Sequence, residues 1–519
     1  MNIPVYLACD GYKTSHVKQY NPKTEVVYST WTPRKSRIDG INEVVVFGLS
    51  YFIQEFLIDS FNNTFFSKPK DEVISEFKRV MSNYTGDTNT SHWEELHDLG
   101  YLPLEIKALD EGTICPIKVP MITIKNTLPQ FYWLTNFIET IMSTEIWKPM
   151  TSATIALEYR KILDKWANKT CDNNNHVSYQ AHDFSLRGMG GLDSGMSSGA
   201  GHLLSFKGSD TIPAILWLEK YYSADSSKEV IAQSIPASEH SVQECNILCN
   251  NCADKEEGEL YNLKSFLNDI YPSNTFSYVG DTYNIWDLCS KVLPKLKDDV
   301  LNRDGKVVIR PDSGNPVDII CGLNTNELYC TMPDLLPSKE LQYKEQAEKG
   351  VVELLWDIFG GTINSKGYKV LDSHIGCIYG DSITLERADA ICRRLELKGF
   401  ASSNIVLGVG SYTYNMNSRD TFGFALKTTY SVVDGKEYML YKDPITDDGE
   451  KKSNKGMVAV IQNGNTLECI DNLDKDSKYK LASKDLLKTV FLNGVQLRRP
   501  TLTEIRERLV NNQKELISV

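Results

Sequence analysis

The sequence predicts an α/β fold whose larger part is an irregular β/α barrel. From about residue 176, short apolar runs alternate with stretches of helical periodicity, and this alternation is typical of a parallel sheet. Five of the runs end in a polar or glycine-containing tip. Side chains collected at the carboxyl ends of many strands favour a barrel over the alternative, an open doubly wound sheet, because the open sheet offers a single crevice.

The five runs are the expected barrel strands, each short, apolar and followed by its tip. They cover residues 177–179, 275–279, 307–309, 375–379 and 405–407. Helices are expected between the strands, because apolar residues recur there at helical spacing, for example at 212–222 and 385–397.

The two ends of the chain are expected to fold together as a second α/β domain, which contains residues 1–150 and 425–519 and leaves 151–424 for the barrel. Its predicted elements are a strand at 105–108, a helix at 132–144, a hairpin at 428–439 and a closing helix at 500–512. Asp434-Gly435 supplies the hairpin turn, and Thr501 or Thr503 begins the closing helix. Residues 243–263 and 323–350 have the composition of peripheral insertions.

The composition is that of a globular protein. Of the 519 residues, 41% are hydrophobic and 24% are charged, and 56 basic against 68 acidic residues give a net charge of −12. Such an acidic chain is a poor nucleic-acid binder, although a local basic pocket for a small anion remains possible. The sequence shows neither a secretory signal nor a membrane-spanning stretch, so we expect a cytoplasmic protein.

The cysteines fit the same setting, because twelve of them are scattered along a long chain without a secretory signal. Cys245, Cys249 and Cys252 have a spacing that can ligate an iron–sulfur cluster. The surrounding asparagine and acidic residues favour a surface insertion instead, and the glycine-rich companion motifs of such an enzyme are missing.

The segment 309–316 is the most informative single motif. Arg310 and Asp312 follow a buried apolar run, and Pro311, Gly314 and Pro316 prevent a helix there. A guanidinium and a carboxylate fixed at a strand end suit a phosphorylated substrate with its Mg²⁺. An internal ion pair that caps a loop is the alternative, and the recurrence of similar tips favours the substrate.

The tips, read together, resemble the nicotinamide phosphoribosyltransferase family over nearly the whole chain. The segments that carry the resemblance occur in the same order as in that family: 10–16, 132–136, 182–188, 206–211, 234–241, 309–316, 380–382 and 442–444. The resemblance implies a type II phosphoribosyltransferase barrel and a homodimer with active sites shared between subunits. The implied reaction joins nicotinamide to phosphoribosyl pyrophosphate with Mg²⁺ present, and ATP hydrolysis through a phosphohistidine improves it. Nicotinate phosphoribosyltransferase and a non-catalytic signalling homologue are the alternatives.

By this resemblance, the nicotinamide ring stacks between Phe184 and Tyr12 of the other subunit, and Asp210 accepts the amide N–H. Taken alone, Phe184 is a core residue and Asp210 a cap of the following helix. A carboxylate beside the ring also repels nicotinate, which carries a like charge, and this favours nicotinamide as the substrate.

Phosphoribosyl pyrophosphate is expected at the strand ends, where Arg310 suits the departing pyrophosphate and Asp281 and Asp312 suit Mg²⁺ and ribose hydroxyls. The resemblance assigns further substrate contacts to Asp10, Arg187, Ser234, Ser277, Gly380, Asp381, Gly410 and Ser411. It also predicts five residues that supply positive charge, several of them across the dimer: Arg34, Arg419, Lys427, Lys442 and Lys451. Individually, each of these cations would be a solvated surface charge.

His240 is the expected phosphorylated residue, because it follows the Pro-Ala-Ser-Glu run that the family uses, with Glu239 beside it. Without the motif it would be a buried histidine bonded to Glu239 or to the backbone. The chain departs from the family at three places: Ser411 replaces a glycine, Ala425 a serine, and Leu186 the aromatic residue of animal members. These changes bear on affinity more than on reaction type.

Overall fold

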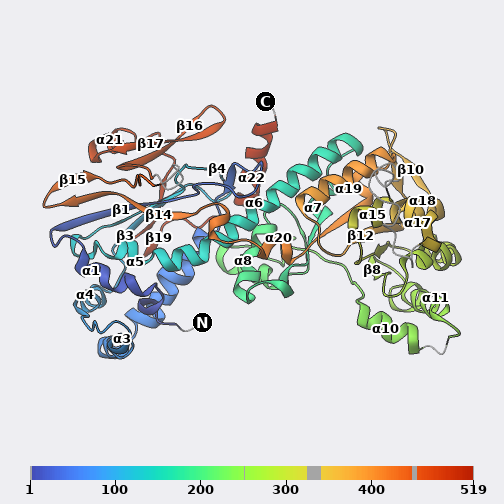
Figure 1. Cartoon of the computed structure of the whole chain (residues 1–519), viewed down its shortest axis with the longest axis horizontal. Helices are drawn as coiled ribbons and strands as arrows, with labels where there is room; N and C mark the ends of the chain where they lie inside the picture. The colour runs from blue at the N-terminus through green and yellow to red at the C-terminus, as the bar shows by residue number, and fades with distance from the viewer. Residues whose placement is uncertain (1–2, 250–251, 324–340, 447–452, 518–519) are drawn as a thin grey trace. The chain divides into compact units, whose positions relative to one another are not determined.

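The computed structural model describes residues 3–249, 252–323, 341–446 and 453–517 (Figure 1). The chain forms two compact units. Unit 1 contains Met1–Thr154, Ala214–Glu229 and Asn417–Val519, and unit 2 contains Ile155–Pro213 and Val230–Met416. The chain passes between the units four times, twice within helices, namely α6 (Glu139–Thr170) and α9 (Ile212–Tyr222).

Unit 2 is built on a parallel sheet of six strands with the order β7-β6-β13-β12-β9-β8. The strands are β6 (Ala181–Asp183), β7 (Gly208–Ser209), β8 (Phe276–Val279), β9 (Val307–Arg310), β12 (Ile375–Tyr379) and β13 (Ile405–Val409). Nearly all their residues are buried, as expected for a parallel sheet covered on both faces.

The sheet curls, and an irregular segment joins its two edge strands. Gln233 forms a parallel bridge to Gly208 at one edge, and Ala237 forms one to Ser277 at the other. The amide of Ser277 donates to the carbonyl of Pro236 at 2.8 Å. The predicted irregular β/α barrel is therefore confirmed, with residues 233–238 in place of a regular strand.

One predicted strand is wrong. Residues 177–179 lie in the helical turn α7 (Val177–Gln180), in which the Tyr179 amide donates to the His176 carbonyl at 2.9 Å, and the strand begins only at Ala181. An alternation of three residues cannot distinguish a strand from a turn of helix. The other four predicted strands are confirmed, as are the helices at 212–222 and 385–397.

Within the described residues, the helices of unit 2 include the end of α6, α7, α8 (Leu192–His202), α10 (His240–Cys249), α11 (Lys255–Ser265), α12 (Ile285–Asp287), α13 (Leu293–Lys295), α14 (Lys297–Leu301), α15 (Pro316–Cys321), α17 (Lys344–Lys349), α18 (Val351–Phe359), α19 (Leu385–Leu397) and α20 (Ser411–Asn415). Helix α15 packs against α18 and α19, and α18 packs against β12. A two-stranded ribbon consists of β10 (Gly361–Ile363) and β11 (Lys369–Leu371).

The segment 243–263 is not a peripheral insertion. It forms most of α10 and α11, in which Gln243, Asn262 and Leu263 are buried. These helices belong to the packed layer around the barrel, and Asn262 bonds to Tyr278 of β8. Of the second predicted insertion, residues 324–340 lie outside the described residues.

Unit 1 is built on an antiparallel sheet of seven strands with the order β15-β14-β1-β5-β3-β18-β19. The strands are β1 (Thr24–Thr32), β3 (Leu104–Ala108), β5 (Ile122–Asn126), β14 (Ala425–Val433), β15 (Lys436–Met439), β18 (Lys488–Leu492) and β19 (Val495–Gln496). Two two-stranded antiparallel ribbons accompany the sheet: β2 (Glu43–Val45) with β4 (Ile114–Pro116), and the hairpin of β16 (Met457–Asn463) with β17 (Thr466–Leu473). The predicted strand at 105–108 and the hairpin at 428–439 are confirmed.

The helices of unit 1 are α1 (His16–Gln19), α2 (Leu49–Phe52), α3 (Lys70–Tyr84), α4 (Ser91–Leu99), α5 (Leu134–Phe137), α21 (Lys475–Lys480) and α22 (Leu502–Ile517), with parts of α6 and α9. Thr501 begins α22: its hydroxyl accepts from the Glu504 amide at 3.2 Å, and the Glu504 carboxylate accepts from the Thr501 amide at 2.8 Å. No helix in the described ranges has the length and apolar character needed to cross a bilayer.

Candidate active site

Chemically reactive side chains gather at the carboxyl ends of the barrel strands. Asp281 and Gly380 follow β8 and β12 closely, Arg310 ends β9, and Asp210 and Gly410 directly follow β7 and β13. Because all six strands are parallel, these ends meet at one edge of the barrel. The structure thus brings together the predicted site residues of unit 2 that lie on strand ends.

Two carboxylates and a histidine form the centre of this edge. Asp281 is buried, and its Oδ2 accepts from the Asp312 amide at 2.9 Å and from the Ser313 hydroxyl at 2.5 Å. His240 Nε2 lies 3.8 Å from Asp281 Oδ1 and 3.6 Å from Asp312 Oδ2. His240 Nδ1 lies 3.0 Å from the Thr282 hydroxyl. The imidazole is held through Nδ1, so Nε2 faces the two carboxylates.

The same centre fits Mg²⁺, although no group of three or more His, Cys, Asp or Glu side chains in the described ranges is arranged to hold a metal by itself. Asp281 Oδ1 is buried and has no hydrogen-bond partner among those residues. Mg²⁺ in proteins is usually held by one or two carboxylates together with substrate phosphates. Asp281 and Asp312 supply that number of carboxylates.

Glycines permit the close approach of these acidic tips. A Cβ on Gly380 would lie 2.0 Å from Asp312 Oδ1, and a Cβ on Gly410 would lie 1.7 Å from Asp381 Oδ1. Any side chain at either position would displace a carboxylate. Gly380 and Gly410 therefore hold Asp312 and Asp381 in place by leaving room for them.

Arg310 is anchored by one side of its guanidinium. Its Nη2 donates to the Ser238 carbonyl at 2.9 Å, whereas its buried Nε has no hydrogen-bond partner in the described part of the chain. The Ser238 hydroxyl accepts from the Gln243 side-chain amide at 2.9 Å and from the Val279 amide at 3.0 Å. Asn262 in turn donates to Gln243 Oε1 at 2.6 Å. A buried hydrogen-bond network thus fixes Arg310 and leaves donors for a ligand.

A cavity of about 390 Å³ opens beside Arg310. Five predicted site residues line it: Phe184, Asp210, Ser234, Ser277 and Arg310. The buried Ser277 hydroxyl has no hydrogen-bond partner within the described ranges, so it is available to a bound molecule. The size suits a small aromatic ligand.

Asp210 contributes a carboxylate to the lining of this cavity. Its Oδ1 accepts from His182 Nε2 at 2.7 Å and from the Ser234 hydroxyl at 2.5 Å. Burial raises the pKa of Asp210, but these two hydrogen bonds and the nearby charge of Arg310 outweigh burial and leave the pKa below its usual value. The carboxylate bonds to the neighbouring strand β6 and to the segment 233–238 rather than to α9, so Asp210 does not act as a cap of that helix. The Phe184 ring lies 4.5 Å from the His182 ring, at 34°.

The predicted residues of unit 1 form a separate basic surface. Tyr12 is 63% exposed and lines a cavity of about 470 Å³ with His16 and Lys427. The ammonium of Lys13 lies 5.6 Å from the centre of the Tyr12 ring. An exposed aromatic ring beside cations is suited to contact with another molecule.

The pKa of Lys427 reflects the positive charge of this surface. Burial lowers its pKa, Glu139 raises it, and Arg34, Lys442 and Arg419 lower it further. These predicted cations of unit 1 are therefore near neighbours. Lys451 lies outside the described residues.

Several predicted residues make contacts outside both clusters or are exposed. The exposed Glu239 carboxylate accepts from the Ser241 hydroxyl instead of contacting His240. Arg187 is exposed. Asp10, in unit 1, accepts from the Thr140 hydroxyl at 2.7 Å. The Ser411 hydroxyl would lie 2.1 Å from a Cβ on Gly188, so Ser411 packs against that loop.

Four residues of the site were not assigned roles from the sequence: His182, Ser238, Gln243 and Thr282. His182 and Ser238 lie within motifs noted in the sequence, and Thr282 directly follows Asp281. All three could have been predicted because they stand next to residues with an expected role. Gln243 offered none, because glutamine is usually a surface residue.

The chain matches two family profiles. Residues 179–495 match the nicotinate phosphoribosyltransferase family, and residues 4–106 match the nicotinamide phosphoribosyltransferase N-terminal domain. Three curated relatives are called nicotinamide phosphoribosyltransferase. The protein of Acinetobacter baylyi is 46% identical over 97% of this chain and 96% of its own. That of Mycoplasma pneumoniae is 35% identical over 85% and 92%, and that of Xanthomonas campestris 30% over 96% and 97%.

Solved structures share the fold at low identity. The nicotinate-nucleotide pyrophosphorylase of Pyrococcus furiosus matches with a TM-score of 0.55 and 14% identity, over 99% of this chain and 97% of its own. Human nicotinic acid phosphoribosyltransferase matches with a TM-score of 0.53 and 14% identity, over 98% and 93%.

Proposed function

Because this chain belongs to the nicotinate phosphoribosyltransferase family and is an enzyme of its nicotinamide phosphoribosyltransferase group, we propose that it joins nicotinamide to phosphoribosyl pyrophosphate in NAD salvage. The pyridine nitrogen forms a bond to ribose C1, and the C1–O bond to pyrophosphate breaks. The products are nicotinamide mononucleotide and pyrophosphate. The observation that carries the proposal is the ring-sized cavity in which the Asp210 carboxylate and the Arg310 guanidinium lie together.

Asp210 supports nicotinamide over nicotinate as the substrate. Its lowered pKa keeps it charged at neutral pH, and its Oδ1 is already bonded to His182 and Ser234. Oδ2 is then the acceptor for the amide N–H of nicotinamide, while Phe184 packs on the ring. A nicotinate carboxylate in the same place would meet a like charge, at a cost of roughly a few kcal/mol in a partly dehydrated site.

Arg310 and the carboxylates suit the pyrophosphate end of the substrate. The unpartnered Nε of Arg310 can donate to a pyrophosphate oxygen as the C1–O bond breaks. Asp281 and Asp312 would hold Mg²⁺, which neutralises the charge that develops on the leaving group. Asp381 would contact a ribose hydroxyl, and the adjacent Gly410 turn would contact the 5′-phosphate.

We assign ATP hydrolysis to His240. With its hydrogen on Nδ1, bonded to Thr282, the imidazole presents the Nε2 lone pair. Nε2 forms a bond to the γ-phosphorus of ATP, the bond from that phosphorus to the β–γ bridging oxygen breaks, and ADP leaves. Water later removes the phosphoryl group. While it is present, its negative charge lies beside Asp281 and Asp312 and strengthens the binding of a cation there.

We infer a homodimer in which the basic surface of unit 1 completes the active site of the partner subunit. The Tyr12 ring is 63% exposed, and Lys427 lies among other cations, so this surface suits an anionic ligand. Tyr12 would cover the nicotinamide ring opposite Phe184, and Lys427 with its neighbours would contact phosphates.

The test is an assay of nicotinamide mononucleotide formation with and without ATP, on the wild type and on His240→Asn. The matched control is His97→Asn, which removes a half-buried histidine from α4 of unit 1. We expect the wild type to form product from nicotinamide and to hydrolyse ATP, and His240→Asn to keep slow product formation without ATP hydrolysis. Product from nicotinate alone would favour nicotinate phosphoribosyltransferase, and no product from either would favour the signalling homologue. Nicotinamide-dependent ATP hydrolysis in His240→Asn would refute the phosphohistidine.

A further inference from the structure

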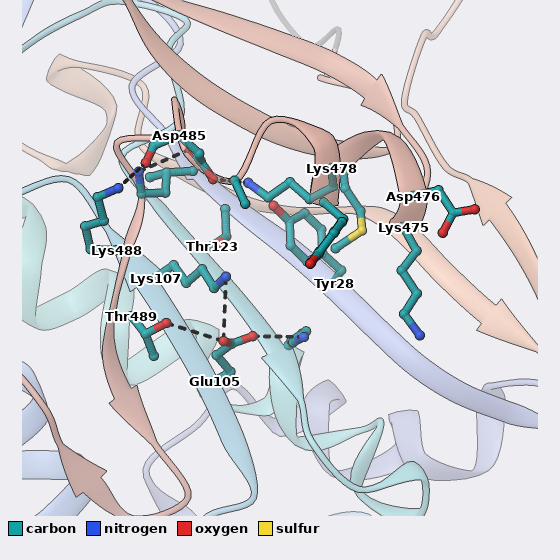
Figure 2. Close-up of a pocket in the computed structure, with 15 residues that line it drawn as sticks. Tyr28, Glu105, Lys107, Thr123, Lys475, Asp476, Lys478, Asp485, Lys488 and Thr489 are labelled. Atoms are coloured by element: carbon teal, nitrogen blue, oxygen red, sulfur yellow. Dashed lines mark hydrogen bonds and ion pairs between the residues drawn. The ribbon is translucent and has the colours of Figure 1, made fainter.

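A further charged cavity, of about 500 Å³, lies on one face of the unit 1 sheet, among elements that carry none of the proposed catalytic residues (Figure 2). We call it the lysine pocket. Its charged lining consists of Lys107, Lys125, Lys475, Lys478 and Lys488 with Glu105, Asp476 and Asp485. The lysines outnumber the carboxylates, so the pocket favours an anion.

The strand register explains why these side chains share a face. Lys107 pairs with Thr123 of β5 on one side and with Thr489 of β18 on the other, and Glu105 pairs with Lys125. Since residues two apart on a strand point the same way, both cross-strand rows face the pocket. Above them lie Met457 of β16 and residues of α21. A sheet face beneath a covering layer is normally apolar, so this polar lining needs a reason.

Buried carboxylates hold the lysines in place. Glu105, 16% exposed, lies 2.9 Å from Lys125 Nζ and 3.7 Å from Lys107 Nζ. Asp485, 5% exposed, accepts from Lys478, and its main-chain carbonyl accepts from Lys488 Nζ at 2.5 Å. Figure 2 shows these contacts converging on Glu105 and Asp485. An ammonium has three donors, so Lys107, Lys125 and Lys488 keep donors for a ligand.

The other wall of the lysine pocket is aromatic and apolar. Tyr479 of α21 contributes an exposed ring, and Met457 lines the same cavity above the buried Tyr28 and Leu487. Thr123 and Thr489, which flank Lys107 in the sheet, also line the cavity. The volume is far larger than a lone phosphate needs and falls in the range of organic-ligand sites, about 300–1,000 Å³. The occupant therefore needs both a compact anionic group and a flat apolar body.

We propose that the lysine pocket binds a nucleoside monophosphate, with its phosphate on Lys107, Lys125 and Lys488 and its base against Tyr479 and Met457. Ammonium groups bind phosphate through charge-assisted hydrogen bonds. A planar base suits a wall made of a tyrosine ring and a thioether. This site is independent of the proposed transferase reaction, because none of its lining residues is assigned to that reaction.

Site-resolved lysine labelling tests the proposal on the wild-type protein. Acetic anhydride would modify exposed lysines, and mass spectrometry would give the rate at each, with adenosine or uridine monophosphate present or absent. We expect either nucleotide to slow modification of Lys107, Lys125 and Lys488 by about threefold or more, and adenosine alone to protect none of them. Lys480, on α21 but outside the pocket, should be unaffected.

Calorimetry gives a second measurement. The double substitution of Lys107→Met and Lys125→Met should raise the Kd of the protected nucleotide about tenfold or more, whereas Lys480→Met should leave it unchanged. Both variants should retain the wild-type transferase rate in the absence of the nucleotide. Protection of active-site lysines such as Lys427 alone, protection of no lysine by either nucleotide, or wild-type affinity in the folded double variant would overturn the proposal.

Discussion

The Arg310 guanidinium and the Ser238 carbonyl are joined by a hydrogen bond of 2.9 Å, and Ser238 stands two residues before His240. The Ser238 hydroxyl is bonded in turn to Gln243, which is fully buried on the first turn of α10. One buried glutamine therefore positions both the residue proposed to meet pyrophosphate and the helix that begins at the proposed phosphohistidine. Coupling between ATP hydrolysis and the transferase step can pass through this contact.

Gln243→Leu tests that coupling. The change removes one buried hydrogen-bond partner from Ser238 and one from Asn262, so we expect the protein to lose about 1–3 kcal/mol of stability. We also expect the factor by which ATP raises the transferase rate to fall about tenfold, because Arg310 and His240 lose their shared anchor. The measurement is the ratio of kcat with and without ATP.

Asn246→Leu is the matched control for Gln243→Leu. Asn246 lies on the same helix and bonds to Asn262 at 3.2 Å, but no contact joins it to Ser238 within the described structure. It should reduce stability without changing the ATP ratio. An equal fall of the ratio in both variants would mean that α10 packing, and not the link through Ser238, is responsible.

Asp210→Ser should shift the enzyme toward nicotinate. Removing the carboxylate removes a repulsion of roughly a few kcal/mol, so the nicotinate-to-nicotinamide ratio of kcat/KM should rise about a hundredfold. Because the pKa of Asp210 is lowered, the wild-type preference should hold across the neutral range and weaken only as acid pH protonates the carboxylate. Asp193→Ser, an exposed change on α8, should alter nothing. An unchanged ratio in Asp210→Ser would remove Asp210 from substrate choice.

The barrel and most of its reactive tips could be predicted because their signals are local. The strands at 275–279, 307–309, 375–379 and 405–407 are apolar runs bounded by glycine or polar residues, and each places its tip at the same edge. β6 and β7 could not be located, because strands of three and two residues carry no measurable period. The closing segment 233–238 has no regular structure to predict.

The contacts between side chains could not be predicted from the sequence, for a different reason. His182 and Asp210 are 28 positions apart in the sequence, and Gln243 and Ser238 are 5 apart. Only the curl of the sheet decides which of these side chains meet. Polar residues such as Gln243 and Asn262 also look like surface residues until the helices pack. This is why 243–263 was expected on the periphery.

Lys427 should give the transferase an unusual alkaline limit. Its pKa lies below that of an ordinary lysine, first because it is buried and also because Arg34, Lys442 and Arg419 surround it. It therefore loses its charge at a lower pH than ordinary lysines do, and the KM for phosphoribosyl pyrophosphate should rise earlier in the alkaline range. Lys427→Arg keeps the charge at all accessible pH values and should move that rise upward. The check is KM against pH, with Lys480→Arg as the control; coincident profiles for the wild type and Lys427→Arg would contradict the assignment.

Glu111 should make unit 1 less stable as the pH rises toward neutrality. Burial raises its pKa to about 7, although the Gly48 and Ser50 amides and the Tyr222 hydroxyl donate to it. Because the folded pKa is raised, the folded state keeps a proton that the unfolded chain releases above its own, lower pKa. The stabilisation that protonated Glu111 contributes is therefore fully present below a pH of about 4.5. It is lost as the pH rises to about 7, and the loss is roughly 3 kcal/mol.

Glu111→Gln removes this titration, so the difference in unfolding free energy between pH 5 and pH 8 should shrink by about 2–3 kcal/mol relative to the wild type. Urea unfolding, with hydrogen exchange at the Gly48 amide as a local probe of unit 1, measures it. Glu105→Gln is the opposite control: burial raises the pKa of Glu105, but Lys125 and Lys107 outweigh burial and lower it. The stability from Glu105 is then lost only in acid, so its removal should leave the difference between pH 5 and pH 8 nearly unchanged. If Glu111→Gln and the wild type lose the same stability over this interval, Glu111 is ionised in the folded protein and its amide donors, rather than burial, decide its charge.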